Sequence, residues 1–355
     1  MKHDLLYSDQ ALPVDIVLSP AWWYKNCGLT FDRDFFFNPS RRVESEQMME
    51  KVLHERWGKY GLGSTYAEKR PEIGAVHLAS GFMISEMLGC PVDYKENDAP
   101  QVMPALAEDL FINEEDAYKT PVYKKFSALT ENLEKHFGWL SGDVNWGGIL
   151  NIALDLRGQE LFMDMAANPD QVNDFFATIK NVIARIVSVI EKKTGSSSIS
   201  VNRNVIHLKK PVFLHSECSH TMISVEHYEK FLFPYDAWWS KTHRPFGIHY
   251  CGADPHRYAQ SFRRLPHLDF LDVGWGGDLK ILRAHLPDTF LNIRLSPVDL
   301  VEQSEDEIRT TIRRLVSEAG DPHLTGVCCI NMDDKVTDKK ITAIFETVEE
   351  LRKEI

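Results

Sequence analysis

The sequence predicts one α/β domain with a (β/α)8 barrel, preceded by an irregular, aromatic-rich N-terminal segment of about 70 residues. Between residues 211 and 354, five short apolar stretches alternate with five helical patterns. Such alternation predicts parallel strands joined by right-handed helical crossovers. A doubly wound sheet fits this alternation as well. We favour the barrel because residues 1–210 have room for three more units and no linker divides the 355-residue chain.

The N-terminal half is predicted from its helical periodicity and its aromatic residues. Trp22 and Trp23 belong to an aromatic group near Arg41 and Arg42. This group either lines a ligand pocket or packs over the barrel core, and the sequence leaves both alternatives open. Apolar spacing further along predicts a strand-like stretch at 139–144 and helices over residues 43–57, 82–88, 115–137, 149–165 and 172–193.

The C-terminal half has the regular pattern. Strands are expected at residues 211–214, 246–251, 268–273, 289–295 and 324–330. Helices are expected at 225–242, near 254–264, from Asp278, at 304–318 and at 338–354. Ser224 is the expected N-cap of the first of these helices, because its side-chain oxygen can accept a bond from a free backbone N–H.

Composition excludes several classes of protein. The formal net charge is −12, whereas a nucleic-acid-binding protein needs a basic face. There is no run of 18 apolar residues for a membrane span and no signal-peptide core. Six cysteines in so long a chain do not form a disulfide framework, and several of them adjoin apolar stretches. We therefore expect a cytoplasmic protein whose thiols are buried or bind metal.

The segment Phe246–Asp254 contains a possible half of a metal site. His249 and Cys251 are two positions apart, so in a strand their side chains project from the same face. Gly252 then turns the chain. An imidazole and a thiol held on stiff backbone are two of the ligands that zinc prefers. The alternative is a satisfied core histidine beside an inert buried cysteine, and two ligands alone do not exclude it.

Reactive side chains of a (β/α)8 barrel collect at the C-terminal ends of its strands. The last expected strand carries Cys328 and Cys329, which point to opposite faces, so only one can join His249 and Cys251. Two cysteines and one histidine with a fourth open or carboxylate-filled position form a known catalytic zinc pattern. The other expected strand ends carry His215, Glu217, Cys218, His220, Asp269, Asp272, Trp275, Arg294, Ser296 and Asn331.

Asp272 is the candidate for the fourth zinc position, and Glu217 is the reserve. Either carboxylate could instead cap a helix or pair with Arg263 or Arg294. Gly274-Trp-Gly-Gly277 opens a helix and is only a weak phosphate-binding signal. The sequence has no Gly-x-Ser-x-Gly, Walker loop or full dinucleotide fingerprint, which disfavours hydrolase, kinase and dehydrogenase functions.

Several segments resemble the uroporphyrinogen decarboxylase superfamily, and within it the corrinoid-dependent methyltransferases exemplified by methylcobalamin:coenzyme M methyltransferase. The most specific are His249-Tyr-Cys-Gly252 and the distant Gly326-Val-Cys-Cys-Ile-Asn331. The others are Ser19-Pro-Ala-Trp-Trp23, Leu150-Asn-Ile-Ala-Leu-Asp-Leu-Arg-Gly158, Met222-Ile-Ser and Phe231-Leu-Phe-Pro-Tyr235. The resemblance covers nearly the whole chain as one domain, residues 1–355.

The resemblance implies a barrel, often dimeric, in which His249, Cys251 and Cys328 bind zinc. The spacing of the family's cysteines selects Cys328 over Cys329, and a carboxylate near the place of Asp272 completes the zinc in some relatives. Two departures are visible. The decarboxylases' Arg-Gln-Ala-Gly-Arg has no counterpart, since Trp22-Trp23-Tyr24-Lys25 stands nearby, and Ser216-Glu-Cys-Ser-His220 differs from the coenzyme M enzymes.

The leading functional prediction is zinc-dependent transfer of a methyl group between a corrinoid carried by a partner protein and a small thiol or methoxylated or methylated molecule. Glu217 and Asp272 are the expected catalytic groups. Trp22, Trp23, Trp275 and His220 are the expected substrate-binding residues. One alternative is a metal-free decarboxylase acting on a tetrapyrrole. Another is a non-catalytic barrel that binds a corrinoid partner or a small ligand.

Overall fold

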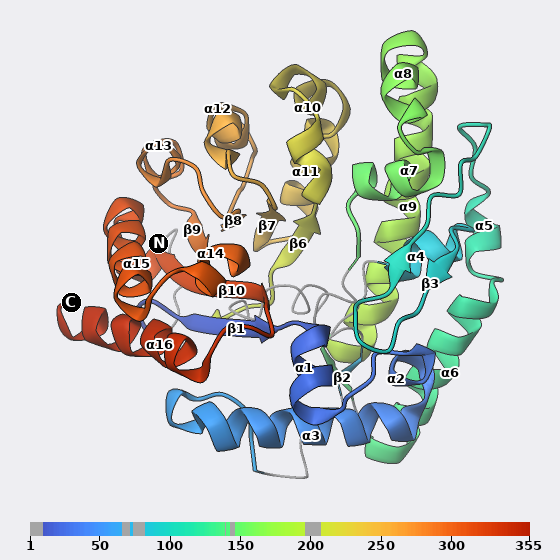
Figure 1. Cartoon of the computed structure of the whole chain (residues 1–355). Helices are drawn as coiled ribbons and strands as arrows, with labels where there is room; N and C mark the ends of the chain where they lie inside the picture. The colour runs from blue at the N-terminus through green and yellow to red at the C-terminus, as the bar shows by residue number, and fades with distance from the viewer. Residues whose placement is uncertain (1–9, 66–71, 74–81, 139, 143–145, 196–206) are drawn as a thin grey trace.

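A curled parallel sheet of six strands forms the centre of the molecule (Figure 1). The computed structural model describes residues 10–65, 72–73, 82–138, 140–142, 146–195 and 207–355. The strands run in the order β1-β10-β9-β8-β7-β6, and each neighbouring pair is parallel. They are β1 (Val14–Leu18), β6 (Phe213–Ser216), β7 (Phe246–His249), β8 (Phe270–Val273), β9 (Phe290–Arg294) and β10 (Thr325–Met332).

Two smaller sheets accompany the large one. β2 (Glu72–Ile73) and β5 (Ser141–Gly142) are parallel, and β3 (Val92–Asp93) and β4 (Gln101–Val102) are antiparallel. The six-stranded sheet and the β2–β5 pair together have the strand number and direction of a (β/α)8 barrel. No ladder joins β5 to β6 or β1 to β2 among the described residues, so the six-stranded sheet is a curled half-barrel.

Helices lie outside the large sheet and around it (Figure 1). In the first half they are α1 (Pro20–Cys27), α2 (Arg33–Phe37), α3 (Pro39–Trp57), α4 (Phe82–Met87), α5 (Glu114–Ala117), α6 (Pro121–Phe137), α7 (Ile149–Arg157), α8 (Glu160–Ala167) and α9 (Pro169–Thr194). In the second half they are α10 (Val225–Phe231), α11 (Phe233–Thr242), α12 (Ala259–Arg263), α13 (Leu279–His285), α14 (Pro297–Glu302), α15 (Glu305–Ala319) and α16 (Asp338–Lys353). Short 3-10 helices are η1 (Gly58–Tyr60), η3 (Cys218–Met222), η4 (Pro255–Tyr258) and η5 (Pro322–Leu324).

The N-terminal segment is more regular than the sequence predicted. The expectation of an irregular segment is wrong for residues 14–37, because they form β1, α1 and α2. The helix predicted over residues 43–57 is confirmed, since it is the larger part of α3. β1 pairs with β10 and is buried along its whole length. Its apolar run is short and contains Asp15, so it lacks a clear period-2 pattern, and pairing with a distant strand makes it a strand.

The strand–helix alternation predicted for the C-terminal half is confirmed. Ser224 caps α10 as expected, accepting a hydrogen bond from His227 N at 3.2 Å. The expected helix 225–242 is divided at Leu232, because Pro234 has no N–H and suits the first turn of a new helix, α11. In the same way Pro121 begins α6 and divides the expected helix 115–137.

Two features complete the fold. Part of the strand-like stretch predicted at 139–144 falls outside the described residues. None of the described helices combines the length and the apolar character that crossing a lipid bilayer requires. Five of the six strands of the large sheet, β6 to β10, come from the second half of the chain. Most of the predicted site residues lie at the C-terminal ends of these strands.

Candidate metal centre

Two cysteines and a histidine come together where β6 and β7 end. The two strands are parallel neighbours, and Ser216 of β6 is the register partner of His249 of β7. Cys218 and Cys251 each follow two positions after this pair, so their thiols lie side by side. Ligand atoms of Cys218, His249 and Cys251 are within 4.8 Å of one another. Tetrahedral zinc, with bonds of about 2.3 Å to sulfur, keeps two sulfur ligands about 3.8 Å apart, so this group fits zinc.

A buried carboxylate orients the histidine. His249 Nδ1 is hydrogen-bonded to Asp272 Oδ2, which leaves Nε2 for the cysteines. Asp272 Oδ1 accepts a second bond from Asn292 Nδ2 at 3.1 Å, and both carboxylate oxygens are thereby engaged. His249, Asp272 and Asn292 are register partners on β7, β8 and β9, and all three are buried. A carboxylate on the far nitrogen of a metal-binding histidine fixes its tautomer and raises its basicity.

The pKa values of the two thiols are shifted in opposite directions. The hydrogen bond from Cys218 lowers the pKa of Cys251 despite burial, and a bond from His249 acts in the same direction. The charge of Arg294, whose Nη1 donates to Cys251 Sγ at 3.1 Å, lowers this pKa as well. The pKa of Cys218 is raised well above its usual value because this thiol donates to Cys251 and is itself buried. Burial lowers the pKa of His249, but the charge of Asp272 outweighs it and raises that pKa to about 9. These surroundings favour the thiolate form of Cys251, the form in which a cysteine binds metal.

Cys328 lies apart from this group. Its strand, β10, is separated from β7 by β9 and β8, and its Sγ accepts a bond from Asn292 Nδ2 at 3.1 Å. Burial and the charge of Asp272 raise the pKa of Cys328 well above the usual value of a thiol. Cys329 is buried in the main hydrophobic core. Of the three predicted ligands, the structure groups His249 and Cys251 with Cys218. Cys328 as a zinc ligand stays a prediction.

Glu217 caps the helix α7, in agreement with the helix-capping alternative considered from the sequence. Its buried carboxylate accepts bonds from Leu150 N at 2.8 Å and Asn151 N at 3.1 Å, in the first turn of α7. It also accepts a bond from Ser219 N at 3.3 Å. A Cβ at Gly148, the N-cap of α7, would lie 2.3 Å from Glu217 Oε2, so only glycine allows this approach. Burial raises the pKa of Glu217 to about 7, and nearby His215 and the two helix N–H groups oppose the rise.

A polar network lies behind β6. His215 Nδ1 is 2.6 Å from Asp236 Oδ1, and the Tyr228 hydroxyl donates to Asp236 Oδ2 at 2.8 Å. His220 follows in η3 and is fully buried, with its ring against Tyr228 and Tyr250 and with no hydrogen bond to either ring nitrogen among the described residues. Burial lowers the pKa of His220 well below its usual value, so the imidazole is neutral.

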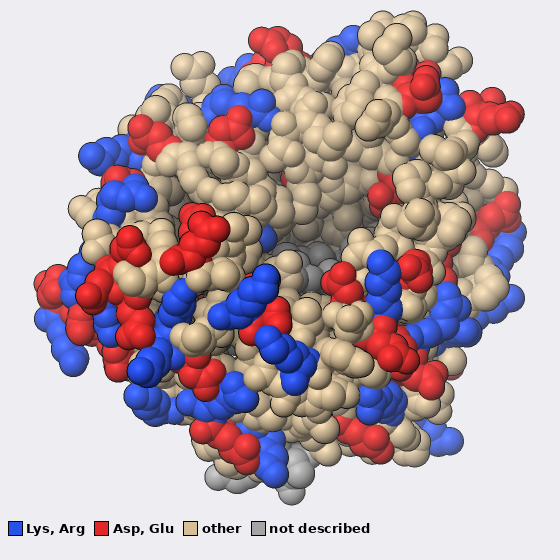
Figure 2. Space-filling view, viewed as in Figure 1, with Lys and Arg blue, Asp and Glu red and all other residues tan. Residues whose placement is uncertain are grey.

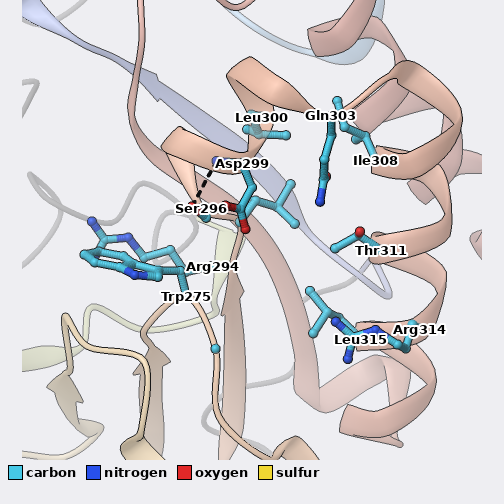
Figure 3. Close-up of a pocket in the computed structure, with 12 residues that line it drawn as sticks. Trp275, Arg294, Ser296, Asp299, Leu300, Gln303, Ile308, Thr311, Arg314 and Leu315 are labelled. Carbon is cyan, nitrogen blue, oxygen red and sulfur yellow. Dashed lines mark hydrogen bonds between the residues drawn. The ribbon is translucent and has the colours of Figure 1, made fainter.

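The predicted tryptophans fall into two groups. Trp275 follows β8, is 39% exposed and lies under the Arg294 guanidinium at 5.0 Å. The two side chains overlap beside a cavity between the strand ends and α15 (Figure 3). Trp22 and Trp23 are buried in α1, where their rings meet at 5.0 Å and Trp22 also packs on Trp57 of α3. Core packing accounts for the position of Trp22. Trp23 also lines a cavity of about 460 Å³ together with Met49 and Leu53, so the ligand-pocket alternative stays a prediction for it.

Comparison with known proteins gives structural relatives only. No protein-family model matches the sequence, and no curated protein matches it. A methyltransferase from Methanosarcina mazei superposes with a TM-score of 0.64 at 14% identity, over 97% of this chain and 94% of its own. At this identity the likeness shows that the two chains share a fold. A B12-independent methionine synthase from Shewanella sp. W3-18-1, in complex with selenomethionine, superposes with a TM-score of 0.50 at 8% identity, over 99% of this chain and 100% of its own.

Two residues of the site were missed from the sequence. Cys218 was among the strand-end residues but was not chosen as a ligand, and the missing information was the register of β6 against β7. Arg294 was considered only as a partner for carboxylates, yet its guanidinium donates to Cys251. The available signal was its place at the end of β9, on the same edge as the cysteines.

Proposed function

We propose that this protein is a zinc-dependent methyltransferase that moves a methyl group between a corrinoid protein and a small thiol or methylated molecule. One observation carries the proposal: Cys218, His249 and Cys251 converge at the C-terminal edge of a parallel sheet. That edge is where enzymes of barrel type hold their reactive groups. The fold is that of the superposed Methanosarcina methyltransferase.

The three side chains would hold the ion and leave a fourth position for substrate. When bound, zinc would supply Lewis-acid chemistry at the sulfur or oxygen that carries the methyl group or receives it. Asp272 keeps the Nδ1 proton of His249 in place, so that Nε2 stays available as a ligand. Arg294 adds a buried positive charge beside Cys251, which offsets the negative charge of two thiolates.

The finer parts of the proposal are the corrinoid partner protein, the cytoplasmic location, a possible homodimer, and the remaining residue roles. Two kinds of residue role remain predictions: Glu217 and Asp272 as catalytic groups, and His220, Trp22, Trp23 and Trp275 as substrate-binding residues. Trp275 has the most direct support, because Arg294 links it to Cys251. The corrinoid requirement needs its own test, since one structural relative is described as B12-independent.

The test begins with metal content. Purified protein is expected to contain close to one zinc per chain by elemental analysis, and a chelator should remove it together with methyl transfer from methylcobalamin to 2-mercaptoethanol. Adding zinc back should restore the transfer. Absence of zinc would end the proposal. Zinc-independent turnover of uroporphyrinogen would replace it with the lyase alternative.

A further inference from the structure

A second cavity adjoins the candidate metal centre on the other side of η3. Its volume is about 500 Å³, within the range of small-molecule sites. Side chains of Phe82, Leu154 and Met222 give it a mainly apolar lining, and Asn151, Asp155 and Ser219 add polar groups. Figure 2 shows a hollow near the centre of the molecule whose upper border consists mostly of uncharged residues.

The cavity and the candidate metal centre share a wall. The short helix η3 carries Cys218, which belongs to the metal-binding group, and Ser219 and Met222, which line the cavity. Asn151 of α7 holds the start of η3 in place. Its Oδ1 accepts a hydrogen bond from Ser219 N at 2.8 Å, and its Nδ2 donates one to Ser216 O at 3.2 Å. A molecule in the cavity therefore lies against the segment that holds a metal ligand.

The charge of the cavity wall favours one class of molecule. Asp155 is the acidic residue among the described lining residues, and none of those residues is Lys, Arg or His. The hydroxyl of Ser85 donates to Asp155 Oδ2 at 2.6 Å and holds the carboxyl in place. Burial raises the pKa of Asp155, although the bond from Ser85 acts in the opposite direction. A half-buried carboxyl group in apolar surroundings gains most from a cation, and the ring of Phe82 also favours one.

We propose that this cavity binds the body of the methylated substrate and selects an apolar molecule with a protonated amine over one with an acid group. The assignment of the molecule as the methylated substrate rests on the proposed methyl transfer. The charge selectivity does not, because it follows from Asp155 and the apolar lining alone.

Three probes with one body and different charge test the selectivity: 4-methoxybenzylamine, 4-methoxybenzyl alcohol and 4-methoxybenzoate. Calorimetric titration of the full, zinc-loaded chain should give the tightest binding for the amine, by about tenfold over the alcohol, as a partly buried charge pair predicts. The benzoate should bind most weakly. Asp155→Asn should remove the preference for the amine and leave the affinity for the alcohol within about threefold.

A second variant keeps the proposal testable if Asp155→Asn does not fold. Met222 is 54% exposed at the cavity wall, so Met222→Lys should fold and should reverse the order in favour of the benzoate. Equal affinities for the three probes, or an unchanged order in both variants, would overturn the charge selectivity. Zinc content is measured on the same samples. Loss of probe binding with zinc retained refutes the cavity alone, whereas probe binding without zinc refutes the proposed methyl transfer alone.

Discussion

Two regions of the sheet's C-terminal edge carry cysteines, one at β6–β7 and one at β9–β10, and their surroundings differ. At β6–β7, Cys218 and Cys251 lie side by side with His249, and a carboxylate holds the imidazole. At β9–β10, Cys328 meets an amide donor at 3.1 Å, and its neighbour Cys329 is packed in the main core. The β6–β7 region groups two thiols and an imidazole, which are soft ligands. The β9–β10 region has a thiol that already accepts a hydrogen bond.

The difference teaches that strand register, as well as strand identity, decides which side chains come together as candidate metal ligands. Parallel neighbours in register bring equivalent positions together, as Ser216 and His249 do for the residues that follow them. Two further strands, β8 and β9, separate Cys328 from His249. Hydrogen bonds link the two regions: His249 is bonded to Asp272, and Asn292 donates both to Asp272 and to Cys328. Cys328 is therefore at the far end of the network that begins at His249.

Replacing one cysteine in each of the two regions gives the largest expected difference in zinc affinity. Cys218→Ser should lower zinc affinity by about 100-fold or more, because a thiolate ligand is lost, while Cys328→Ser should change it by less than about threefold. Competition with a chromophoric chelator measures both values. X-ray absorption of zinc in the Cys328→Ser protein should still show two sulfur ligands. The opposite ranking of the two variants would return Cys328 to the ligand set.

The carboxylate behind His249 should have the next largest effect. Asp272→Asn should lower zinc affinity by about 10-fold to 100-fold, since the histidine loses the partner that fixes its tautomer. Asp236→Asn is a matched control, because it changes an equally buried carboxylate bonded to His215. It should reduce the free energy of unfolding and leave zinc affinity nearly unchanged. Equal zinc affinities in the two variants would contradict the special role of Asp272.

Glu217→Gln separates a capping role from a catalytic one. A neutral amide accepts fewer and weaker bonds from α7, so the free energy of unfolding should fall by about 1–2 kcal/mol in urea denaturation. Thr120→Ala removes the N-cap of α6 and serves as the control for the loss of a helix cap. If Glu217→Gln abolishes methyl transfer in a protein of unchanged stability and zinc content, Glu217 is a catalytic group.

The smallest effect is expected at the exposed tryptophan of the edge. Trp275→Leu removes the cation–π contact with Arg294 and should cost about 0.5–1 kcal/mol of stability, with little change in zinc affinity. Trp238→Leu is matched, because Trp238 is similarly exposed and lies under Lys180 at 4.5 Å. A higher KM for methyl transfer in the Trp275 variant alone would support substrate contact by Trp275. Identical KM values would remove it from the pocket.

Apolar periodicity and the positions of turn and capping residues were sufficient to predict most of the strands and helices of the C-terminal half. Ser224 as a helix cap and the five strands from β6 to β10 follow from local patterns, because each short apolar run is bounded by turn residues. The strand β1 was missed because its pairing partner, β10, lies at the other end of the chain. No local pattern contains that information.

The site was predicted in part for the same reason. His249 and Cys251 are two positions apart in one strand, so their common face is a local property of the sequence. Choosing Cys218 required knowing that Ser216 stands opposite His249, which is a property of two strands together. The resemblance to a family directed the choice to Cys328, and the geometry of this chain groups Cys218 with the other two ligands.

The pairing of β1 with β10 has a consequence for how the molecule is assembled during synthesis. Val14 pairs with Val327, so one edge of β1 has no partner until nearly the whole described chain has been made. The strands that hold Cys218, His249 and Cys251 are consecutive in the chain and can pair much earlier. Local contacts form faster than distant ones. The growing polypeptide can therefore form the region of the candidate metal centre first and pair β1 with β10 last.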